Sequence, residues 1–392
     1  MIALGTWDVL MLPLLVVGAI AARLLRRSDL IGLGPEPMIN YVYDARALRS
    51  QGYRAETFVT NLFFITNRFD RILARKGLVG LGLDLATKRA YWHVVFHYRV
   101  LFTSFHGGPL GSSPWLWRLE PTLLRIAGIK TVIMPYGSDV QDLRRCKNLA
   151  YVNAISKDYP GHFRKSSAIA RRISMWERDG TVVLSGCDWV DYMTYWDVLQ
   201  VSHICIDARS IVPAVLPGVD DPSRPLRVLH APNHRAIKGT AAIIEAVDAL
   251  REEGVGIELV LLEGVPNDQV HQVIRSCDVI ADQLVIGWYA MFAMEGMAHG
   301  RAVICHQDPR YLALFRNQGL LAEAEPPLID ATERSIKSVL AELCANRSLV
   351  AEHAQACRDY VLRHHSVEYM GEQFASILSN AGVAASTGSE VK

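Results

Sequence analysis

The sequence lacks the features of disulfide-bonded, zinc-binding and nucleic-acid-binding proteins. Its 392 residues contain seven cysteines, an odd number, and no Cys-x-x-Cys pair. A disulfide framework and a zinc knuckle are therefore not indicated, and the pattern is typical of a reducing compartment. Basic and acidic side chains nearly balance, 41 against 40, which gives a formal net charge of +1. This balance argues against a general nucleic-acid binder, so any phosphate site must be local.

Long uncharged runs are scarce as well, and the most prominent one lies at the N-terminus. Fourteen uncharged residues separate Asp8 from Arg23, fewer than the roughly 20 that span a bilayer comfortably. The arginines of this segment follow the apolar run, whereas a secretory signal has its cations in front, and the positive-inside bias keeps the rest of the chain cytoplasmic. We expect residues 1–27 to form a helix that anchors the protein to the cytoplasmic face of the cell membrane, either spanning it or lying on it. A helix buried against the N-terminal domain is the alternative, because Pro13 and Gly18 weaken a regular span.

The remaining chain is long enough for two domains, since half of its residues are apolar and one core rarely serves so many. Short apolar runs alternate with amphipathic segments, which is typical of parallel sheets covered by helices. The fold class is therefore α/β, with two doubly wound Rossmann-like domains that face a cleft. Prolines cluster between positions 213 and 225 and mark a linker. The expected parts are an apolar helix (1–27), an N-terminal domain (28–212), a C-terminal domain (213–365), a helix that packs back on the N-terminal domain (366–381) and a disordered tail (382–392).

Regular elements can be placed from the apolar runs and their turn-forming flanks. The expected strands are 28–34, 55–60, 100–105, 131–136, 181–186, 227–231, 257–264, 278–285 and 302–306. The expected helices between them include 39–52, 240–254, 267–277 and 290–300. Ligands of such sheets bind at the carboxyl ends of the strands, so the site is expected between the domains.

Two segments of the second half suggest phosphate and sugar binding. HAPNHRAIKGT (230–240) follows an expected strand and precedes an expected helix, so Arg235 and Lys238 can face an anion near a helix N-terminus. A basic surface turn is the alternative for this segment taken alone. In GWYAMFAMEGMAHGRAV, Glu295 lies about two turns inside a helix, within reach of a ribose at the helix end.

Together, HAPNHRAIKG and DQLVIGWYAMFAMEGMAHGRAVI resemble the C-terminal domain of GT-B glycosyltransferases of the group 1, or family 4, type. GPEPMINYVYDARALRSQGY, FTSFHGG and MPYGSDVQ resemble N-terminal segments of the same group. The likeness covers residues 28–380. It implies a transferase that moves a sugar from a nucleotide diphosphate sugar to an acceptor hydroxyl, with retention of anomeric configuration and without a metal ion.

The resemblance also implies roles for single residues. Arg235 and Lys238 would hold the donor diphosphate, and Glu295 would bind its ribose. His106, in a glycine-rich turn after a strand, and Asp139, after Gly-Ser, are the implied catalytic residues. For His106 a structural role at the strand end is the alternative, and for Asp139 it is capping of the following helix.

One position departs from the family pattern. The first Glu of its Glu-x7-Glu motif falls on Gly287, so the carboxylate that usually contacts the donor sugar is missing. Asp282 and Gln283, one strand upstream, are the polar contacts expected to replace it, and a buried strand-end capping role is the alternative for both. The further donor-binding residues expected are Gly239, Asp282, Gln283, Gly287, Trp288 and Tyr289.

No metal and no other cofactor is expected, because the sequence contains no Asp-x-Asp that would hold a metal-bridged diphosphate. The expected partners are a nucleotide-sugar donor and a glycan or glycolipid acceptor that the N-terminal domain selects, with the membrane bound through residues 1–27 and no nucleic acid. A non-catalytic scaffold of the same fold is the alternative that Gly287 suggests. A sugar-nucleotide epimerase is another, but it would be soluble, and the apolar N-terminus speaks against it.

Overall fold

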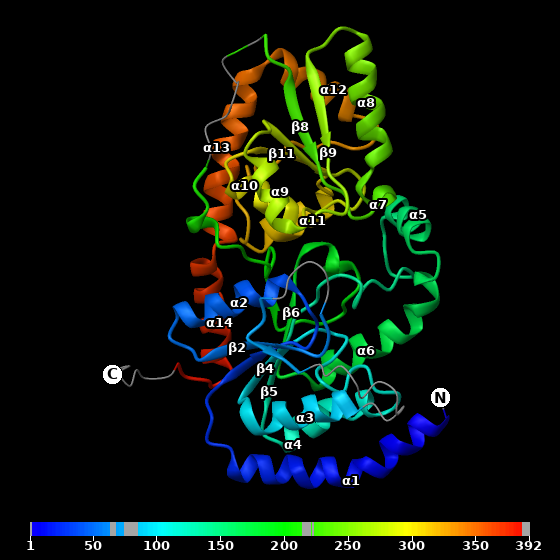
Figure 1. Cartoon of the computed structure of the whole chain (residues 1–392), viewed down its shortest axis with the longest axis vertical. Helices are drawn as coiled ribbons and strands as arrows, with labels where there is room; N and C mark the ends of the chain where they lie inside the picture. The colour runs from blue at the N-terminus through cyan, green and yellow to red at the C-terminus, as the bar shows by residue number, and fades with distance from the viewer. Residues whose placement is uncertain (1, 63–67, 74–84, 214–220, 222, 386–392) are drawn as a thin grey trace.

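The computed structural model describes residues 2–62, 68–73, 85–213, 221 and 223–385. Within these ranges the chain forms two lobes, each built on a parallel sheet that helices cover (Figure 1). One sheet has seven strands in the order β3-β2-β1-β4-β5-β6-β7, and the other has four in the order β11-β10-β8-β9. We call the part built on the first sheet the N-lobe and the part built on the second the C-lobe. The α/β class and the pair of doubly wound lobes are confirmed.

The strands of the N-lobe are short apolar runs, and the central ones are buried on both faces, as parallel strands between helix layers must be. Ile31 pairs with Ala55 on one neighbour and with Val100 on the other, which places strand β1 in the middle of the sheet. The N-lobe strands are β1 (Ile31–Leu33), β2 (Ala55–Val59), β3 (Arg71–Ile72), β4 (Val100–Thr103), β5 (Lys130–Ile133), β6 (Val182–Ser185) and β7 (Val198–Leu199).

Helices cover both faces of this sheet and include the last helix of the chain. Helix α14 crosses back from the C-lobe and packs on α2, where Gly371 lies so close that an added Cβ would stand 2.6 Å from the carbonyl oxygen of Ala47. Phe374 of α14 packs on Phe102 of β4 with ring centroids 5.3 Å apart. The helices of this part are α1 (Ile2–Leu25), α2 (Ile39–Ser50), α3 (Leu85–His97), α4 (Glu120–Ile126), α5 (Leu149–Asp158), α6 (Ser166–Asp179) and α14 (Val367–Asn380).

The C-lobe repeats the pattern with a smaller core of aliphatic side chains between its sheet and helices α8 and α12. Its strands are β8 (Leu226–His230), β9 (Ile257–Leu261), β10 (Val279–Gln283) and β11 (Ala302–Cys305). Its helices are α7 (Arg235–Lys238), α8 (Thr240–Glu252), α9 (Asn267–Ile274), α10 (Met291–Ala298), α11 (Pro309–Asn317), α12 (Ile336–Ala345) and α13 (Arg347–His364).

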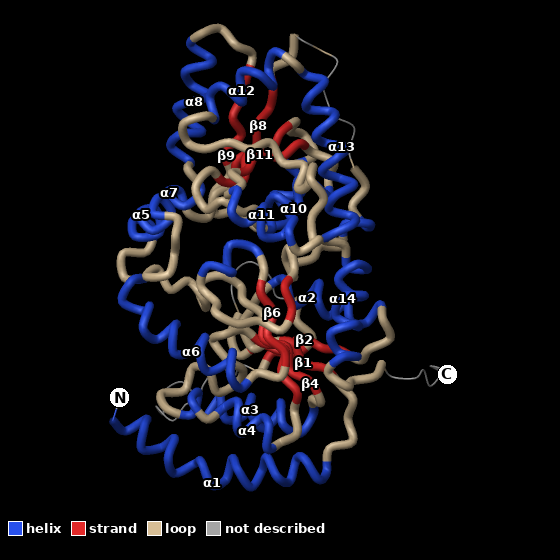
Figure 2. Tube along the Cα trace, turned by 180° about the vertical axis from the view of Figure 1, so that it is seen from behind, coloured by secondary structure: helices blue, strands red, loops and turns tan. Residues whose placement is uncertain are grey.

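Helix α1 lies at the end of the molecule opposite the C-lobe and runs across helices α3 and α4 (Figures 1 and 2). By length and composition, Trp7–Leu25 is the one described helical stretch apolar enough to cross a membrane. One face of the helix packs on the N-lobe, which agrees with part of the alternative expectation. The other face stays exposed.

Most expected elements are present with shorter bounds. The run 278–285 forms a strand only over Val279–Gln283, and 100–105 only over Val100–Thr103, because the chain turns away into loops at the cleft. Most of the expected linker, 214–220 and 222, lies outside the described residues, as does 386–392 of the expected tail. Before it, Val383 is buried, so ordered packing extends past residue 382.

Candidate functional site

The carboxyl ends of both sheets meet between the lobes, where two cavities open. The larger, of about 510 Å³, lies between the loop after β5 and helix α5 on one side and Lys238, Gln283 and Ala290 on the other. The smaller, of about 310 Å³, lies between α2 and the start of α9. Both cavities therefore take polar groups from each lobe, at the edge where such sheets bind ligands.

Lys238 is held at the larger cavity by a buried ion pair. Its Nζ donates to Asp282 Oδ1 over 2.6 Å, and the side chains are only 9% and 0% exposed. The other oxygen of Asp282 accepts from the backbone N–H of Ala290 at 3.1 Å, so it also fixes the loop before α10. Gly239 follows with φ +72°, a left-handed conformation that lets the chain turn from α7 into α8. An ammonium donates three hydrogen bonds, so Lys238 retains capacity for a ligand.

Arg235 does not join Lys238 at this cavity. Its guanidinium donates to both carboxylate oxygens of Glu263, at 2.8 and 2.6 Å, on the outside of the lobe. The expected pair of diphosphate ligands is thus divided, since a bidentate carboxylate partner already occupies the fork of Arg235.

The amides at the start of α7 contact the other lobe. The N–H of Ile237 donates to Asp158 Oδ2 at 2.9 Å, and the N–H of Ala236 lies 3.4 Å from Asp158 Oδ1. Tyr159 is also hydrogen-bonded to His234. Helix α5 therefore places a carboxylate where the sequence had suggested a bound anion.

Glu295 lies inside the C-lobe beside the smaller cavity. It is 3% exposed, accepts a hydrogen bond from Asn267 Nδ2 at 2.7 Å and has His271 Nε2 at 3.6 Å. Burial raises its pKa to about 7, the Asn267 hydrogen bond acts in the opposite direction, and the charge of Asp282 raises it further. Asp282 thus couples Glu295 electrostatically to the site of Lys238.

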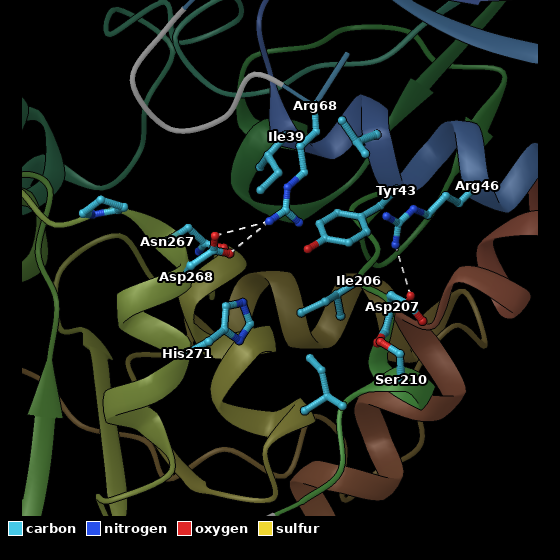
Figure 3. A pocket seen from close by; sticks show the side chains of 13 residues that line it. Ile39, Tyr43, Arg46, Arg68, Ile206, Asp207, Ser210, Asn267, Asp268 and His271 are labelled. Carbon is cyan, nitrogen blue, oxygen red and sulfur yellow. Dashed lines mark hydrogen bonds and ion pairs between the residues drawn. The ribbon is translucent and has the colours of Figure 1, made fainter. Parts of the chain in front are cut away.

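The smaller cavity is lined by polar and charged side chains from both lobes. Tyr43 and His271 project toward the same space from opposite lobes (Figure 3). The pKa of Tyr43 is raised to about 12, first by burial and then by the negative charge of Glu295. Arg68 reaches across the gap to Asp268, 3.2 Å away, and closes one side (Figure 3).

The loop around Gly287 differs from the expectation. Gly287 has φ +90°, and an added Cβ would stand 2.8 Å from Cβ of Asp308, so a glutamate does not fit there. Trp288 and Tyr289, expected beside the donor, are instead 1% and 3% exposed. The Trp288 ring packs on Phe315, and the Tyr289 hydroxyl is bonded to the side chains of Tyr360 and His365. Both aromatic residues therefore serve the packing of the C-lobe.

Gln283 and His106 are better placed for contact with a ligand. Gln283 lines the larger cavity, and its buried Oε1 has no hydrogen-bond partner among the described residues. His106 is exposed, and its Nδ1 lies 2.6 Å from the hydroxyl of Tyr136, a residue that lines the larger cavity. Desolvation, with the charges of Arg172 and Lys165, lowers the pKa of His106 to about 4, so its imidazole is neutral at pH 7.

Asp139 does not cap the following helix, which was its alternative, because the N-cap of α5 is Asn148. It is 1% exposed. One oxygen accepts from the N–H groups of Tyr136 and Gly137, each at 3.0 Å, and the other from Phe105 at 3.1 Å. Asp139 therefore ties the His106 loop to the Tyr136 loop and acts as a positioning residue.

Sequence reasoning missed Glu36, which stands after β1 at the same sheet edge. Ser104 Oγ donates to Glu36 Oε1 at 3.0 Å, while the buried Oε2 has no hydrogen-bond partner among the described residues. Burial raises the pKa of Glu36 to about 8, and neighbouring Asp139 raises it too. The available signal was a carboxylate between two prolines at the end of a buried strand. Asp158 and Asn267 gave no such signal, because their roles depend on the other lobe or on a distant helix.

Comparison with known proteins supports the architecture. No protein-family model and no curated protein matches the sequence. Among solved structures, Anabaena HepE in complex with UDP and glucose is similar with a TM-score of 0.58 at 11% identity, over 90% of this chain and 99% of that one. Sucrose-phosphate synthase from Thermosynechococcus elongatus is similar with a TM-score of 0.58 at 10% identity, over 90% and 99% of the two chains. These neighbours are GT-B glycosyltransferases, and the chain has their fold of two Rossmann-like lobes facing a cleft.

Proposed function

We propose that the protein is a glycosyltransferase that moves a sugar from a nucleotide diphosphate sugar to an acceptor hydroxyl. The observation that carries the proposal is the buried Lys238–Asp282 pair, which presents an ammonium to the larger cavity at the carboxyl edge of the C-lobe sheet. In the GT-B fold this edge faces the other lobe, so a donor held there meets an acceptor held by the N-lobe.

The donor diphosphate lies beside Lys238 in this proposal. Negative charge builds on the departing diphosphate as the glycosidic bond breaks, and a fixed ammonium stabilises that charge best where water is excluded. Asp282 orients the ammonium, and Gln283 offers a buried amide to the same cavity. Gly239 allows the tight turn after Lys238, and Gly287 leaves backbone rather than a carboxylate near the sugar. Arg235 is a diphosphate ligand only if it leaves Glu263 on donor binding.

The nucleoside end lies toward the smaller cavity. Glu295 accepts hydrogen bonds from the ribose hydroxyls, and Asn267 holds its carboxylate in place. On the N-lobe, His106 meets the sugar or the acceptor as a neutral imidazole positioned by Tyr136 and, through the loop, by Asp139. Following the resemblance, transfer proceeds with retention and without a metal ion or other cofactor.

The acceptor in this proposal is a lipid-linked or surface glycan at the cytoplasmic face of the cell membrane. Support comes from the apolar helix α1 on the N-lobe, the lobe that selects the acceptor in the resembling family. A nucleic-acid substrate is not part of the proposal, because the net charge is only +1.

The donor is identified by thermal stabilisation of the whole chain with UDP-, GDP- and dTDP-sugars. UDP-glucose comes first, since the HepE structures hold UDP and glucose or UDP-glucose. Sugar transfer from the stabilising donor to a lipid-linked acceptor is then followed, and the anomeric configuration of the product is read by NMR. An inverted product contradicts retention, activity lost on chelation contradicts metal independence, and epimerised donor without transfer indicates an epimerase.

Lys238 provides the matched test of the site. Because Lys238→Met alone leaves the Asp282 carboxylate buried and unpaired, the variant to measure is the double change Lys238→Met and Asp282→Asn. Turnover should fall roughly a hundredfold or more while the protein stays folded. Lys337→Met is the control, since Lys337 forms an exposed ion pair of the same 2.6 Å length with Glu253. The proposal is contradicted if the double variant keeps the parental turnover or if the parent binds no nucleotide sugar. Either result would indicate a non-catalytic scaffold.

A further inference from the structure

The two faces of helix α1 have opposite surroundings. On one face Asp8, Leu15, Ala19 and Ala22 are buried, and Gly18 lies directly against the ring of Trp92. The exposed face carries large apolar side chains at the three- and four-residue spacing of one helix stripe. They are Val9 (58% exposed), Leu10 (63%), Leu14 (57%), Val17 (63%), Ile20 (48%), Leu24 (78%) and Leu25 (69%). We call these seven residues the outer stripe.

The buried face is fixed to the N-lobe near both ends. Asp8 Oδ1 accepts from Lys88 Nζ at 2.6 Å in an ion pair whose side chains are 1% and 3% exposed, and Asp8 Oδ2 accepts from the N–H of Trp115. After the helix, Arg26 donates to the carbonyl oxygens of Val95 and Gly128 at 2.8 and 3.0 Å. To stand upright through a bilayer, α1 would have to break the buried Asp8–Lys88 ion pair and carry the Asp8 carboxylate away from its partner. A helix lying flat keeps every one of these contacts.

Cationic and aromatic groups flank the outer stripe. Arg23 and Arg27 are exposed at its C-terminal end, and Trp115, 60% exposed, lies at the other end beside Asp8. The guanidinium carbon of Arg118 lies 5.9 Å from the centre of the Trp115 ring. Within residues 1–27 the only acidic residue is Asp8, and it is buried. An apolar strip bordered by Arg and Trp is complementary to the interface of an anionic bilayer.

We propose that helix α1 docks flat on an anionic lipid bilayer, with the outer stripe in the boundary between headgroups and acyl chains. The helix is about 36 Å long at 1.5 Å per residue, so the stripe gives an extended contact. Because α1 lies at the far end of the molecule from the C-lobe (Figure 1), the protein stands on its N-lobe with the C-lobe toward the cytoplasm. The proposal rests on the proposed function, because it refines the membrane location given there. The docking itself does not require sugar transfer.

Flotation of the full chain with vesicles tests the contact. The parent should float with vesicles of phosphatidylcholine and phosphatidylglycerol, and less with phosphatidylcholine alone. The double variant Leu14→Glu and Val17→Glu should lower partition by roughly a hundredfold, since two apolar side chains no longer enter the interface. Leu149→Glu, a change at a leucine of α5 that is 77% exposed, should leave partition unchanged. Circular dichroism confirms that both variants are folded.

The depth of the helix distinguishes flat docking from spanning. Spin labels on cysteines placed singly at Leu10, Val17 and Leu24 should report the same shallow depth on the bound protein, with the unsubstituted chain giving the background from its own cysteines. A depth that peaks at position 17 indicates a spanning helix and overturns the proposal. So does equal flotation of the glutamate variant, or a parent that forms a dimer through the stripe and ignores vesicles. Donor stabilisation in vesicle-free solution tests the transferase separately, so the two proposals can fail independently.

Discussion

Single residues of the cleft differ in how free they are to meet a ligand. Glu295 and Lys238 are both buried. Lys238 keeps hydrogen-bonding capacity toward the larger cavity, and Glu295 keeps it toward the start of α9. Asp139 and Asp282 instead have both oxygens engaged by the protein, and they hold loops and a lysine in place. We therefore expect substitutions of Glu295 and Lys238 to have different consequences from substitutions of Asp139 and Asp282.

The protonation of Glu295 should control nucleotide binding. Its pKa is raised to about 7 by burial, so the carboxylate that we propose accepts from the ribose hydroxyls forms only as the pH rises through that value. We expect the affinity for UDP to increase from pH 6 to pH 8, measured by calorimetry. The Glu295→Gln variant lacks the pH dependence that the carboxylate causes, so only the pH dependence from titration of the ligand remains. Identical pH profiles for the two proteins would contradict the ribose role.

Gly287 should not tolerate the glutamate of the family motif. Its φ of +90° and the Asp308 Cβ at 2.8 Å from any added Cβ make both backbone and side chain strained. Gly287→Ala is expected to destabilise the fold by about 1–3 kcal/mol, measured by urea unfolding, and Gly287→Glu by at least as much. Gly161→Ala serves as the control, since no atom lies within 4 Å of its added Cβ. A stable, more active Gly287→Glu protein would show that the site had merely lost its carboxylate.

The role of each of three helices, α10, α5 and α1, depends on which of its faces is buried. Helix α10 places Glu295 inside the lobe, and α5 carries Asp158 to the amides of α7. Helix α1 differs from both, because its polar contacts face inward and its apolar stripe faces outward. Both the packing of its inner face and the buried Asp8–Lys88 ion pair therefore attach α1 to the N-lobe.

The Asp8–Lys88 pair should dominate the attachment of α1. Removing one partner leaves the other charge buried, so Asp8→Asn is expected to cost about 3–5 kcal/mol in free energy of unfolding. The double change Asp8→Asn and Lys88→Met should recover most of that loss. Glu253→Gln breaks an exposed ion pair with Lys337 and is expected to cost under about 1 kcal/mol. Equal small losses for Asp8→Asn and Glu253→Gln in urea unfolding would argue against a buried anchor.

At the scale of the whole molecule, the lobes are joined by polar contacts beside the cavities. Asn148 donates to the carbonyl oxygens of Val285 and Ile286, and the Tyr311 hydroxyl donates to Asp191 at 3.0 Å. Together with Asp158 they hold the lobes close on the side of the larger cavity. In the proposed transferase, lobes held close in this way would exclude water from the sugar and limit hydrolysis of the donor.

Buried carboxyls should make the protein less stable as the pH rises from 6.5 to 8. Burial raises the pKa of Glu36 to about 8 and of Glu120 and Glu295 to about 7, so the folded state binds more protons than the unfolded one and stability falls as the pH rises through those values. Burial lowers the pKa of His203 and His230 to about 4, so their contribution is lost as the pH falls below the ordinary value near 6.5.

The measurement is a series of melting temperatures from pH 5 to pH 8.5. A decline from pH 6.5 to pH 8 is the expected result, with a smaller change below pH 6.5, where the carboxyls and the histidines act in opposite directions. A melting temperature that rises steadily to pH 8.5 would show that the pKa values of these carboxyls are not raised in the folded protein.

The sequence by itself determined the alternation of strands and helices, and with it two parallel sheets and a cleft at their carboxyl ends, because periodicity and turn residues are local properties of the chain. It also pointed to Lys238 and Glu295, each beside a recognisable strand or helix end. Only the tertiary structure decided that Arg235 pairs with Glu263 and that Asp139 caps a loop. These outcomes depend on contacts between segments far apart in sequence.

The same distinction separates the remaining residues. Nothing local shows that Trp288 and Tyr289 turn into the core, since an aromatic pair after a glycine suits a binding loop equally well. Only a glycine fits at position 287 because Asp308, on a different loop, lies against it. The orientation of α1 is fixed by the contact of Asp8 with Lys88, eighty residues away in the sequence. Composition determined that the N-terminal helix is apolar, and a buried ion pair with a distant helix decided which of its faces meets the surroundings.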